Sequence, residues 1–227
     1  MSERTQEILL RLKTLANPAN IAGMARYGIN PQNTLGVSIP VLRQIAKETG
    51  RDHQLAQEFW DSGIHEARIL AVYVEDPKQV TEEQMERWVS DLDSWDVCDQ
   101  LCNNLFDRLP YTYSKALAWS TRQEVFVKRA GFVLMATLTV HNKRMSDEQL
   151  VQFLPIILHE ATDERNYVKK AVNWALRQIG KRNRMLNQLA IQTATQIAQI
   201  DDKTARWIAT DALRELTSEK IQSRLKD

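Results

Sequence analysis

The sequence has few residues that interrupt regular structure. Gly 7 and Pro 6 together make about 6% of the 227 residues, half of the roughly 12% found in average proteins. This scarcity predicts long elements joined by short connections. With 43% apolar and 26% charged residues, the chain can bury a sizeable core, which excludes a wholly disordered, collagen-like or small disulfide-bonded protein.

The sequence also lacks a long hydrophobic run. Its longest nearly apolar stretch, residues 130–140, is too short to cross a bilayer. The N-terminus has no basic segment followed by an apolar stretch, so we expect no secretory signal, and the expected compartment is the cytoplasm. Cysteine is scarce: Cys98 and Cys102 lie one helical turn apart, and we expect both to be reduced and packed.

The formal net charge of +1 hides two oppositely charged regions. Residues 75–107 carry ten acidic and two basic side chains, whereas residues 164–184 carry seven basic side chains and one acidic one. The first region favours a cationic ligand, and the second favours an anionic one such as phosphate.

Apolar residues recur along most of the chain with the period of an α-helix, and strand-like alternation is absent. The sequence therefore predicts an all-α fold. Helix-start and helix-stop residues lie at the expected junctions, and the one marked loop, 28–40, is rich in Gly, Asn and Pro. The expected helices cover 3–16, 39–48, 66–74, 82–92, 96–109, 125–140, 147–160, 165–180, 186–200 and 203–216.

An internal repeat predicts the architecture. The pentapeptide FVKRA at 126–130 recurs as YVKKA at 167–171, 41 residues later. A period near 40 residues with two helices per unit is typical of HEAT and armadillo arrays. We therefore expect one α-α superhelix, or solenoid, of HEAT-like helix pairs that spans residues 1–227 as a single domain. Nothing in such a solenoid requires a second copy, so we expect a monomer.

Several common catalytic and cofactor motifs are missing. The two His-Glu pairs do not continue into a zinc-protease HExxH motif, because Ile69 and Asp163 occupy the second histidine position. Gly180 and Lys181 are not preceded by the first glycine of a phosphate loop, and GxSxG and GxGxxG do not occur. Two cysteines and four scattered histidines form no metal-binding pattern. We expect neither a metal nor a cofactor.

The segment DSWDVCD at 93–99 is the strongest local anomaly. Asp96 falls in the first turn of the expected helix, where a carboxylate complements the helix dipole, so we interpret it as mainly structural. Trp95 and Asp99 are one turn apart on the flank of that helix, away from the centre of its apolar face. Two interpretations stay open: an interfacial tryptophan beside a solvated aspartate, or part of a functional site.

A tryptophan and three cations form a narrow stripe opposite the apolar face of the expected helix 165–180. The members of this stripe are Lys170, Trp174, Arg177 and Lys181. Such a stripe suits a nucleic-acid backbone, whose phosphates bind cations and whose sugars or bases stack on an aromatic ring. The alternative is a tryptophan packed on a neighbouring repeat, beside cations that are merely solvated.

Arg129 immediately precedes the apolar stretch 130–140, in a helix otherwise suited to burial. A buried guanidinium needs a partner, because an isolated buried charge is costly. Asp99 is one candidate partner and a DNA phosphate is another. A purely structural ion pair within the protein is the alternative.

Five segments occur in order along the chain: MARY at 24–27, LGV at 35–37 with Pro40 and Arg43, WDxxD at 95–99, VKRA at 127–130 and VKKAxxWxLR at 168–177. Together they resemble the AlkD family of DNA alkylation repair glycosylases. Their specificity lies in their common order and spacing. The resemblance implies a HEAT-like solenoid whose concave face holds duplex DNA. It also implies release of N3- and N7-alkylated purines without flipping of the nucleotide into a pocket.

The resemblance implies roles for individual residues. Asp99 is similar to the catalytic carboxylate of the family. Trp95 and Trp174 are similar to aromatic walls beside the deoxyribose of the lesion. Arg129 is similar to a backbone or catalytic contact, and Tyr27 to a further aromatic contact. The chain departs from the family pattern at two positions that often hold a second tryptophan and a lysine; here they are Ser94 and Ile29.

The chemistry of the implied reaction agrees with these residue types. A purine alkylated at N7 or N3 is already cationic, so it leaves without the general acid that ordinary glycosidases need. The transition state then requires a carboxylate and aromatic faces that stabilise an oxocarbenium-like sugar. Asp99 can supply the carboxylate and can also position the attacking water.

We therefore expect a monofunctional DNA glycosylase that acts on alkylated bases in double-stranded DNA. In this interpretation Lys170, Arg177 and Lys181 hold phosphates. The alternative is a non-catalytic solenoid that binds DNA structures or a protein partner through the same concave face.

Overall fold

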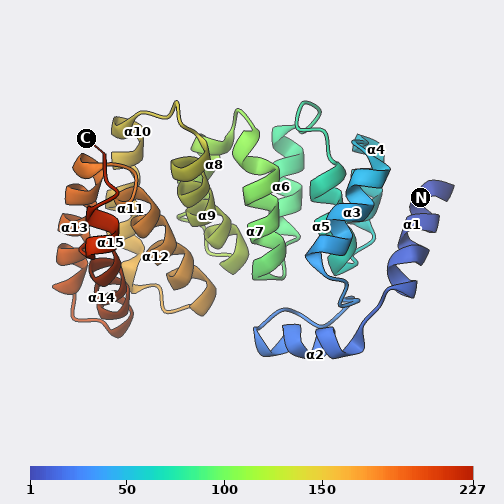
Figure 1. Cartoon of the computed structure of the whole chain (residues 1–227), viewed down its shortest axis with the longest axis horizontal. Helices are drawn as coiled ribbons and strands as arrows, with labels where there is room; N and C mark the ends of the chain where they lie inside the picture. The colour runs from blue at the N-terminus through green and yellow to red at the C-terminus, as the bar shows by residue number, and fades with distance from the viewer. Residues whose placement is uncertain (227) are drawn as a thin grey trace. The chain divides into compact units, whose positions relative to one another are not determined.

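The computed structural model describes residues 1–226. The chain divides into two compact units, Met1–Leu109 and Pro110 onward. Both units consist of α-helices with short 3-10 turns, and residues 1–226 contain no strand (Figure 1). The all-α prediction is therefore confirmed, whereas a single domain over residues 1–227 stays a prediction.

The first unit is built around one buried helix, α5. Its helices are α1 (Glu3–Thr14), α2 (Pro18–Arg26), α3 (Ile39–Thr49), α4 (His53–Asp61), α5 (His65–Val74), α6 (Glu82–Ser90) and α7 (Trp95–Asn104), followed by the 3-10 turn Phe106–Arg108. Most residues of α5 are buried, and α5 packs against α3, α4 and α7. Side chains on α3, α5 and α7 can therefore line common surfaces.

Two tryptophans join α4 to α6. The rings of Trp60 and Trp88 are stacked with their centroids 4.2 Å apart, and the guanidinium of Arg68 lies 5.3 Å from the Trp60 ring. The indole N–H of Trp60 donates to a carboxylate oxygen of Asp91 at 2.9 Å. Stacked aromatic rings contribute more to stability than their buried area alone, so these contacts hold α4 and α6 together.

The second unit contains the internal repeat. Its helices are α8 (Thr112–Trp119), α9 (Val125–His141), α10 (Asp147–Val151), α11 (Phe153–His159), α12 (Asn166–Gly180), α13 (Arg184–Ala198), α14 (Lys203–Leu216) and α15 (Glu219–Gln222), with a 3-10 turn at Glu160–Thr162. The two copies of the repeat lie at the starts of α9 and α12, which pack together. Their first aromatic residues, Phe126 and Tyr167, have ring centroids 5.5 Å apart.

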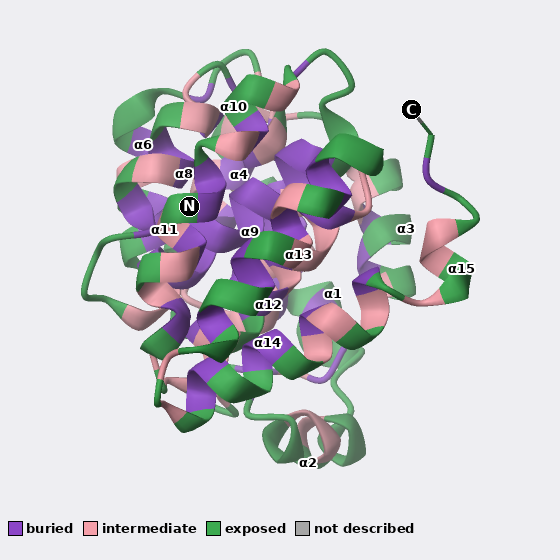
Figure 2. Cartoon of the chain, turned by 90° about the vertical axis from the view of Figure 1, so that its left-hand side faces the viewer, coloured by how far each residue is buried: buried purple, intermediate pink, exposed green. Residues whose placement is uncertain are grey.

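The observed helices differ from the expected ones where the apolar pattern is short or interrupted. The expected helix 147–160 is broken into α10 and α11, because Pro155 has no N–H to donate to the carbonyl of Val151. α2, α4 and α8 were not expected. α2 buries no residue, and in Figure 2 it carries only the colours of exposed and intermediate residues, so it has no strong apolar periodicity to detect.

Two further expectations concern cysteine and membranes. Cys98 and Cys102 are buried on α7 and form no disulfide, as expected. Within residues 1–226, no helix combines the length and apolar character that crossing a membrane requires.

Candidate active site

A buried carboxylate holds the loop between α2 and α3. Glu66, at the start of α5, is fully buried, and its oxygens accept hydrogen bonds from the backbone N–H groups of Leu35 at 2.8 Å and Gly36 at 2.7 Å. The backbone N–H of His65 donates to the carbonyl of Asn33 at 2.9 Å. Because buried polar groups need partners, these bonds favour one conformation of the loop.

Gly36 lets the first turn of α2 lie directly against this loop. Its φ is +75°, and a Cβ at this position would lie 2.3 Å from the carbonyl oxygen of Asn17, so only glycine fits without distortion. The N–H of Asn17 donates to the carbonyl of Leu35 at 2.7 Å, and the side-chain amide of Asn20 donates to the carbonyl of Gly36 at 2.9 Å. The start of α2 is thereby fixed by backbone contacts.

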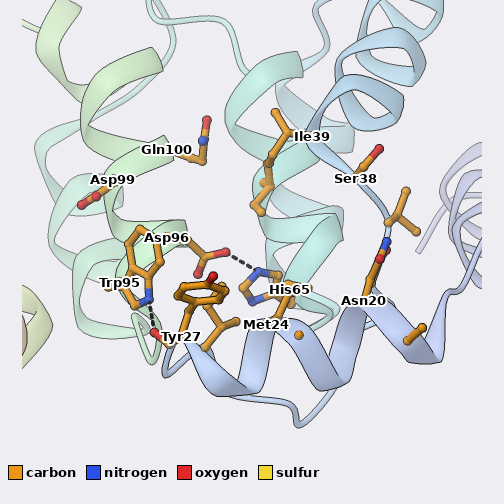
Figure 3. Close-up of a pocket in the computed structure, with 16 residues that line it drawn as sticks. Asn20, Met24, Tyr27, Ser38, Ile39, His65, Trp95, Asp96, Asp99 and Gln100 are labelled. Carbon is orange, nitrogen blue, oxygen red and sulfur yellow. Dashed lines mark hydrogen bonds and ion pairs between the residues drawn. The ribbon is translucent and has the colours of Figure 1, made fainter.

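The end of α2 is joined to α7 through an aromatic side chain. The indole N–H of Trp95, the first residue of α7, donates to the backbone carbonyl of Tyr27 at 3.1 Å. Trp95 is half-buried, whereas Tyr27 is 77% exposed. Figure 3 shows the two rings next to each other at the edge of the same pocket.

Asp96 does more than complement the dipole of α7. Its Oδ2 lies 2.8 Å from Nε2 of the buried His65, and the hydroxyl of Ser94 donates to its Oδ1. Burial lowers the pKa of His65, but the hydrogen bond to Asp96 and nearby carboxylate charges outweigh it, so this pKa lies above its usual value. Burial also opposes ionisation of Asp96, and its bonds to His65 and Ser94 nevertheless hold its pKa below the usual value. The pair therefore joins the starts of α5 and α7.

These elements surround a cavity of about 660 Å³ in the first unit. Most of its wall is apolar and includes Met24, Ile29, Val37, Ile39 and Ile69. Its polar side is formed by α7, which contributes Asp96, Asp99 and Gln100 beside Trp95. Ile29, one of the two departures from the family pattern, is thus part of the apolar wall.

The cavity brings together three residues that the sequence analysis singled out. Asp99 and Trp95 are both half-buried and line it from α7, and Tyr27 lines it from the end of α2. In Figure 3 the side chain of Asp99 points away from the His65–Asp96 pair, so the two carboxylates lie in different surroundings. A carboxylate beside aromatic rings can stabilise a cation electrostatically.

Two of the three cations predicted on α12 form ion pairs within the protein. The guanidinium of Arg177 lies 2.8 Å from Oε2 of Glu215 and 3.5 Å from Oδ2 of Asp211, and Nζ of Lys181 lies 2.9 Å from Oε1 of Glu215. Burial opposes ionisation of Glu215, but the two cations outweigh it and hold its pKa below the usual value. Arg177 and Lys181 are therefore partly exposed and paired with carboxylates of α14, and their predicted contacts with phosphate stay predictions.

The other predicted residues of the second unit differ in exposure. Lys170 is exposed and Trp174 is half-buried on α12. Arg129 is buried, and its Nη1 donates to the backbone carbonyl of Tyr167 at 2.7 Å. The roles predicted for Trp174 and Arg129 beside a lesion stay predictions.

Comparison with known families tests the resemblance. Residues 8–216 match the model of a family described as DNA alkylation repair enzyme. The chain belongs to the DNA alkylation repair enzyme family. The match includes every segment on which the resemblance was based, so the resemblance is confirmed. No curated protein is significantly similar to the chain in sequence.

Solved structures show the fold of this family member. One similar structure is described as a new family of proteins related to the HEAT-like repeat DNA glycosylases with affinity for branched DNA structures. It has a TM-score of 0.77 and 17% identity, covering 93% of this chain and 94% of that one. An engineered protein also matches, with a TM-score of 0.41 and 12% identity over 96% of this chain and 99% of that one. A designed armadillo repeat protein in complex with a peptide matches with a TM-score of 0.39 and 12% identity over 81% of this chain and 87% of that one. The match with a TM-score of 0.77 confirms the HEAT-like fold.

Sequence analysis of this DNA alkylation repair family member missed two buried residues that shape the site. His65 and Glu66 were considered only as the start of an incomplete zinc-binding motif. In the structure, His65 is hydrogen-bonded to Asp96, and Glu66 accepts hydrogen bonds from the backbone at residues 35 and 36. The available signal was their place at the start of the strongly apolar segment 69–72, since titratable groups in a buried helix need partners. Within residues 1–226, no group of three or more His, Cys, Asp or Glu side chains is arranged to hold a metal ion.

Proposed function

We propose that this family member is a DNA glycosylase that hydrolyses the N-glycosidic bond of N3- or N7-alkylated purines in double-stranded DNA. The observation that carries the proposal is the position of Asp99 on the wall of a cavity bordered by Trp95 and Tyr27. Membership of the DNA alkylation repair enzyme family supports alkylated DNA as the substrate. Trp174 and Arg129 are proposed to contact the same DNA.

The proposed reaction needs stabilisation of a cation rather than a proton donor. An alkylated purine takes both electrons of the bond to C1′ and leaves as a neutral base, while the sugar becomes oxocarbenium-like. The carboxylate of Asp99 and the ring faces of Trp95 and Tyr27 stabilise this positive charge. Water then attacks C1′ and gives its proton to Asp99, which leaves a free base and an abasic sugar.

The second carboxylate of the cavity has a different proposed role. Asp96 is held by His65 and Ser94 on its two oxygens, so it is engaged before any substrate binds. We assign Asp96 to positioning the start of α7, and hence Trp95 and Asp99, rather than to the reacting sugar. Catalysis is assigned to Asp99, which lines the cavity beside Trp95.

The variant Asp99→Asn tests this assignment with little change in size. We expect release of free 7-methylguanine from a methylated duplex to slow by about 10²–10⁴-fold, the range for loss of a general base. Asp93→Asn is the matched control, because Asp93 is an exposed acid of the same segment and does not line the cavity. An unchanged rate in Asp99→Asn would remove Asp99 from the mechanism.

A second candidate function is binding of DNA without catalysis. The observation that favours it is the similar structure whose proteins are described as having affinity for branched DNA. This alternative predicts that the wild type releases no 7-methylguanine and binds a four-way junction more tightly than a duplex of the same length. The same two assays therefore separate the candidates.

A further inference from the structure

A second cavity, of about 340 Å³, lies on α3 and is separate from the one that contains Asp99. Its cations are Arg43, Lys47 and Arg51, each four residues after the last, so they follow one side of α3 and its C-terminal end. The rest of the wall is Ala46 and Gly50 beside these cations, Tyr73 from α5 and Asn104 from α7. We refer to these seven residues as the α3 groove.

The α3 groove has an excess of positive charge. Among residues 1–226, no carboxylate lies within ion-pair distance of Arg43 or Lys47, and the guanidinium of Arg43 instead lies 5.7 Å from the centre of the Tyr73 ring. Arg51 is only 4.0 Å from a carboxylate oxygen of Asp76, at the limit for an ion pair. Like charges at this spacing repel one another, so an anion in the groove lowers the free energy of the folded chain.

The wall of the α3 groove is hydrogen-bonded to the wall of the Asp99 cavity. The hydroxyl of Tyr73 donates to Oε1 of Gln100 at 2.6 Å, and the side-chain amide of Asn104 donates to the same oxygen at 3.0 Å. Gln100 follows Asp99 on α7 and itself lines the first cavity. A ligand in the α3 groove is therefore held at a fixed position relative to Asp99.

We propose that the α3 groove binds a phosphodiester of the DNA backbone next to the nucleotide that reaches the Asp99 cavity. The guanidinium of Arg43 presents paired donors to phosphate oxygens, and Lys47 adds a compact charge beside it. Through Gln100, the bound phosphate sets the register of the strand relative to Asp99. The inference rests on the DNA ligand of the proposed function and does not require catalysis.

The variants Arg43→Gln and Lys47→Gln test the groove on an undamaged duplex. Each phosphate contact that is lost makes the slope of log K against log salt less steep by about 0.9, because fewer counterions are released on binding. At about 0.1 M salt this corresponds to a loss of about eightfold in duplex affinity. Lys13→Gln is the control, because it removes one exposed cation from α1 outside the groove. Fluorescence anisotropy measures the wild type and all four variants. Arg43→Lys, which keeps the charge, is expected to keep most of the salt slope.

The proposal is overturned if both variants bind with the affinity and slope of Lys13→Gln. Since the side chains of Arg43 and Lys47 are exposed, the variants are expected to keep the thermal stability of the wild type. The result is independent of base release: a protein without glycosylase activity can still lose duplex affinity in Arg43→Gln. Conversely, if the wild type releases alkylated bases and both variants keep its duplex affinity, the phosphate site in the α3 groove is refuted and the proposed function is not.

Discussion

Two helices of this protein carry the same cationic pattern in different surroundings. Each has an arginine followed four residues later by a lysine. On α12, Arg177 and Lys181 share the carboxylate of Glu215 on α14. On α3, Arg43 faces the uncharged ring of Tyr73 on α5. The neighbouring helix, rather than the helix that carries the cations, decides whether the charge is available to a ligand.

This comparison also shows that a local excess of basic residues in the sequence does not by itself identify a phosphate site. The basic region 164–184 is partly matched within the protein: besides the pairs on α12, Arg165 pairs with Asp163, and Arg182 donates to the carbonyl of Thr139. The α3 groove lies outside that region. A local excess of one charge therefore indicates an ion-pair network as readily as a phosphate site.

The largest effect is expected when α3 is made to resemble α12. Ala46 lines the α3 groove, so Ala46→Glu places a carboxylate among its cations. We expect duplex affinity to fall by more than about tenfold at low salt, because two phosphate contacts are weakened together. Anisotropy titrations measure the effect, with Ala118→Glu on the exposed side of α8 as the charge-matched control. Equal affinities of the two variants would show that the groove does not face DNA.

The converse change makes α12 resemble α3. Glu215→Gln removes the carboxylate shared by Arg177 and Lys181, and we expect duplex affinity to rise by up to about eightfold, as for one added phosphate contact. The melting temperature should fall slightly, because Lys181 loses its carboxylate partner and Arg177 keeps only Asp211. Arg177→Gln in the unaltered protein should change affinity by less than about twofold, since its charge is already matched. A large loss in Arg177→Gln would contradict the comparison and restore α12 as a phosphate site.

The smallest effect is expected from pH, because the first unit contains a histidine–carboxylate pair, whereas the lowered pKa of Glu215 keeps the partner of the α12 cations ionised at neutral pH. The raised pKa of His65 means that its bond to Asp96 stabilises the fold fully below about pH 6.5, and that this stability is lost as pH rises through the raised value. The lowered pKa of Asp96 gives stability above about pH 4, lost as pH falls through the lowered value. The cations of α12 stay charged throughout this range.

Melting temperatures measured from pH 5 to pH 9 test this assignment. The wild type should lose stability across the upper half of the range, and Asp96→Asn should lose less, because the cause of the raised histidine pKa is gone. Identical pH profiles for the two proteins would show that the His65–Asp96 pair does not contribute to stability.

Much of the fold could be predicted from the sequence, because long apolar periodicities survive in it. α9, α12 and α14 were predicted nearly to their ends. α2 could not be, because it is short and its position depends on the backbone of Gly36 and on Trp95 rather than on an apolar face.

The candidate site was also predicted only in part: the sequence identified some of its residues but not their hydrogen-bond and ion-pair partners. Asp99 and Trp95 were found because an acid and a tryptophan on the flank of a helix are unusual. The partners of His65, Arg177 and Lys181 lie 31 to 38 residues away in the sequence, and helix periodicity carries no information about which side chain a neighbouring helix presents. The identity of such partners required the packed structure.

The attachment of α2 has a consequence for how the protein opens. Since α2 buries no side chain and is held at its two ends by hydrogen bonds, its detachment exposes little apolar surface and requires only a fraction of the free energy of global unfolding. Denaturant has little effect on such a step, because its influence scales with newly exposed surface. Backbone amides of α2 are therefore expected to exchange with deuterium through local unfolding, whereas those of the buried α5 exchange only when the whole first unit unfolds.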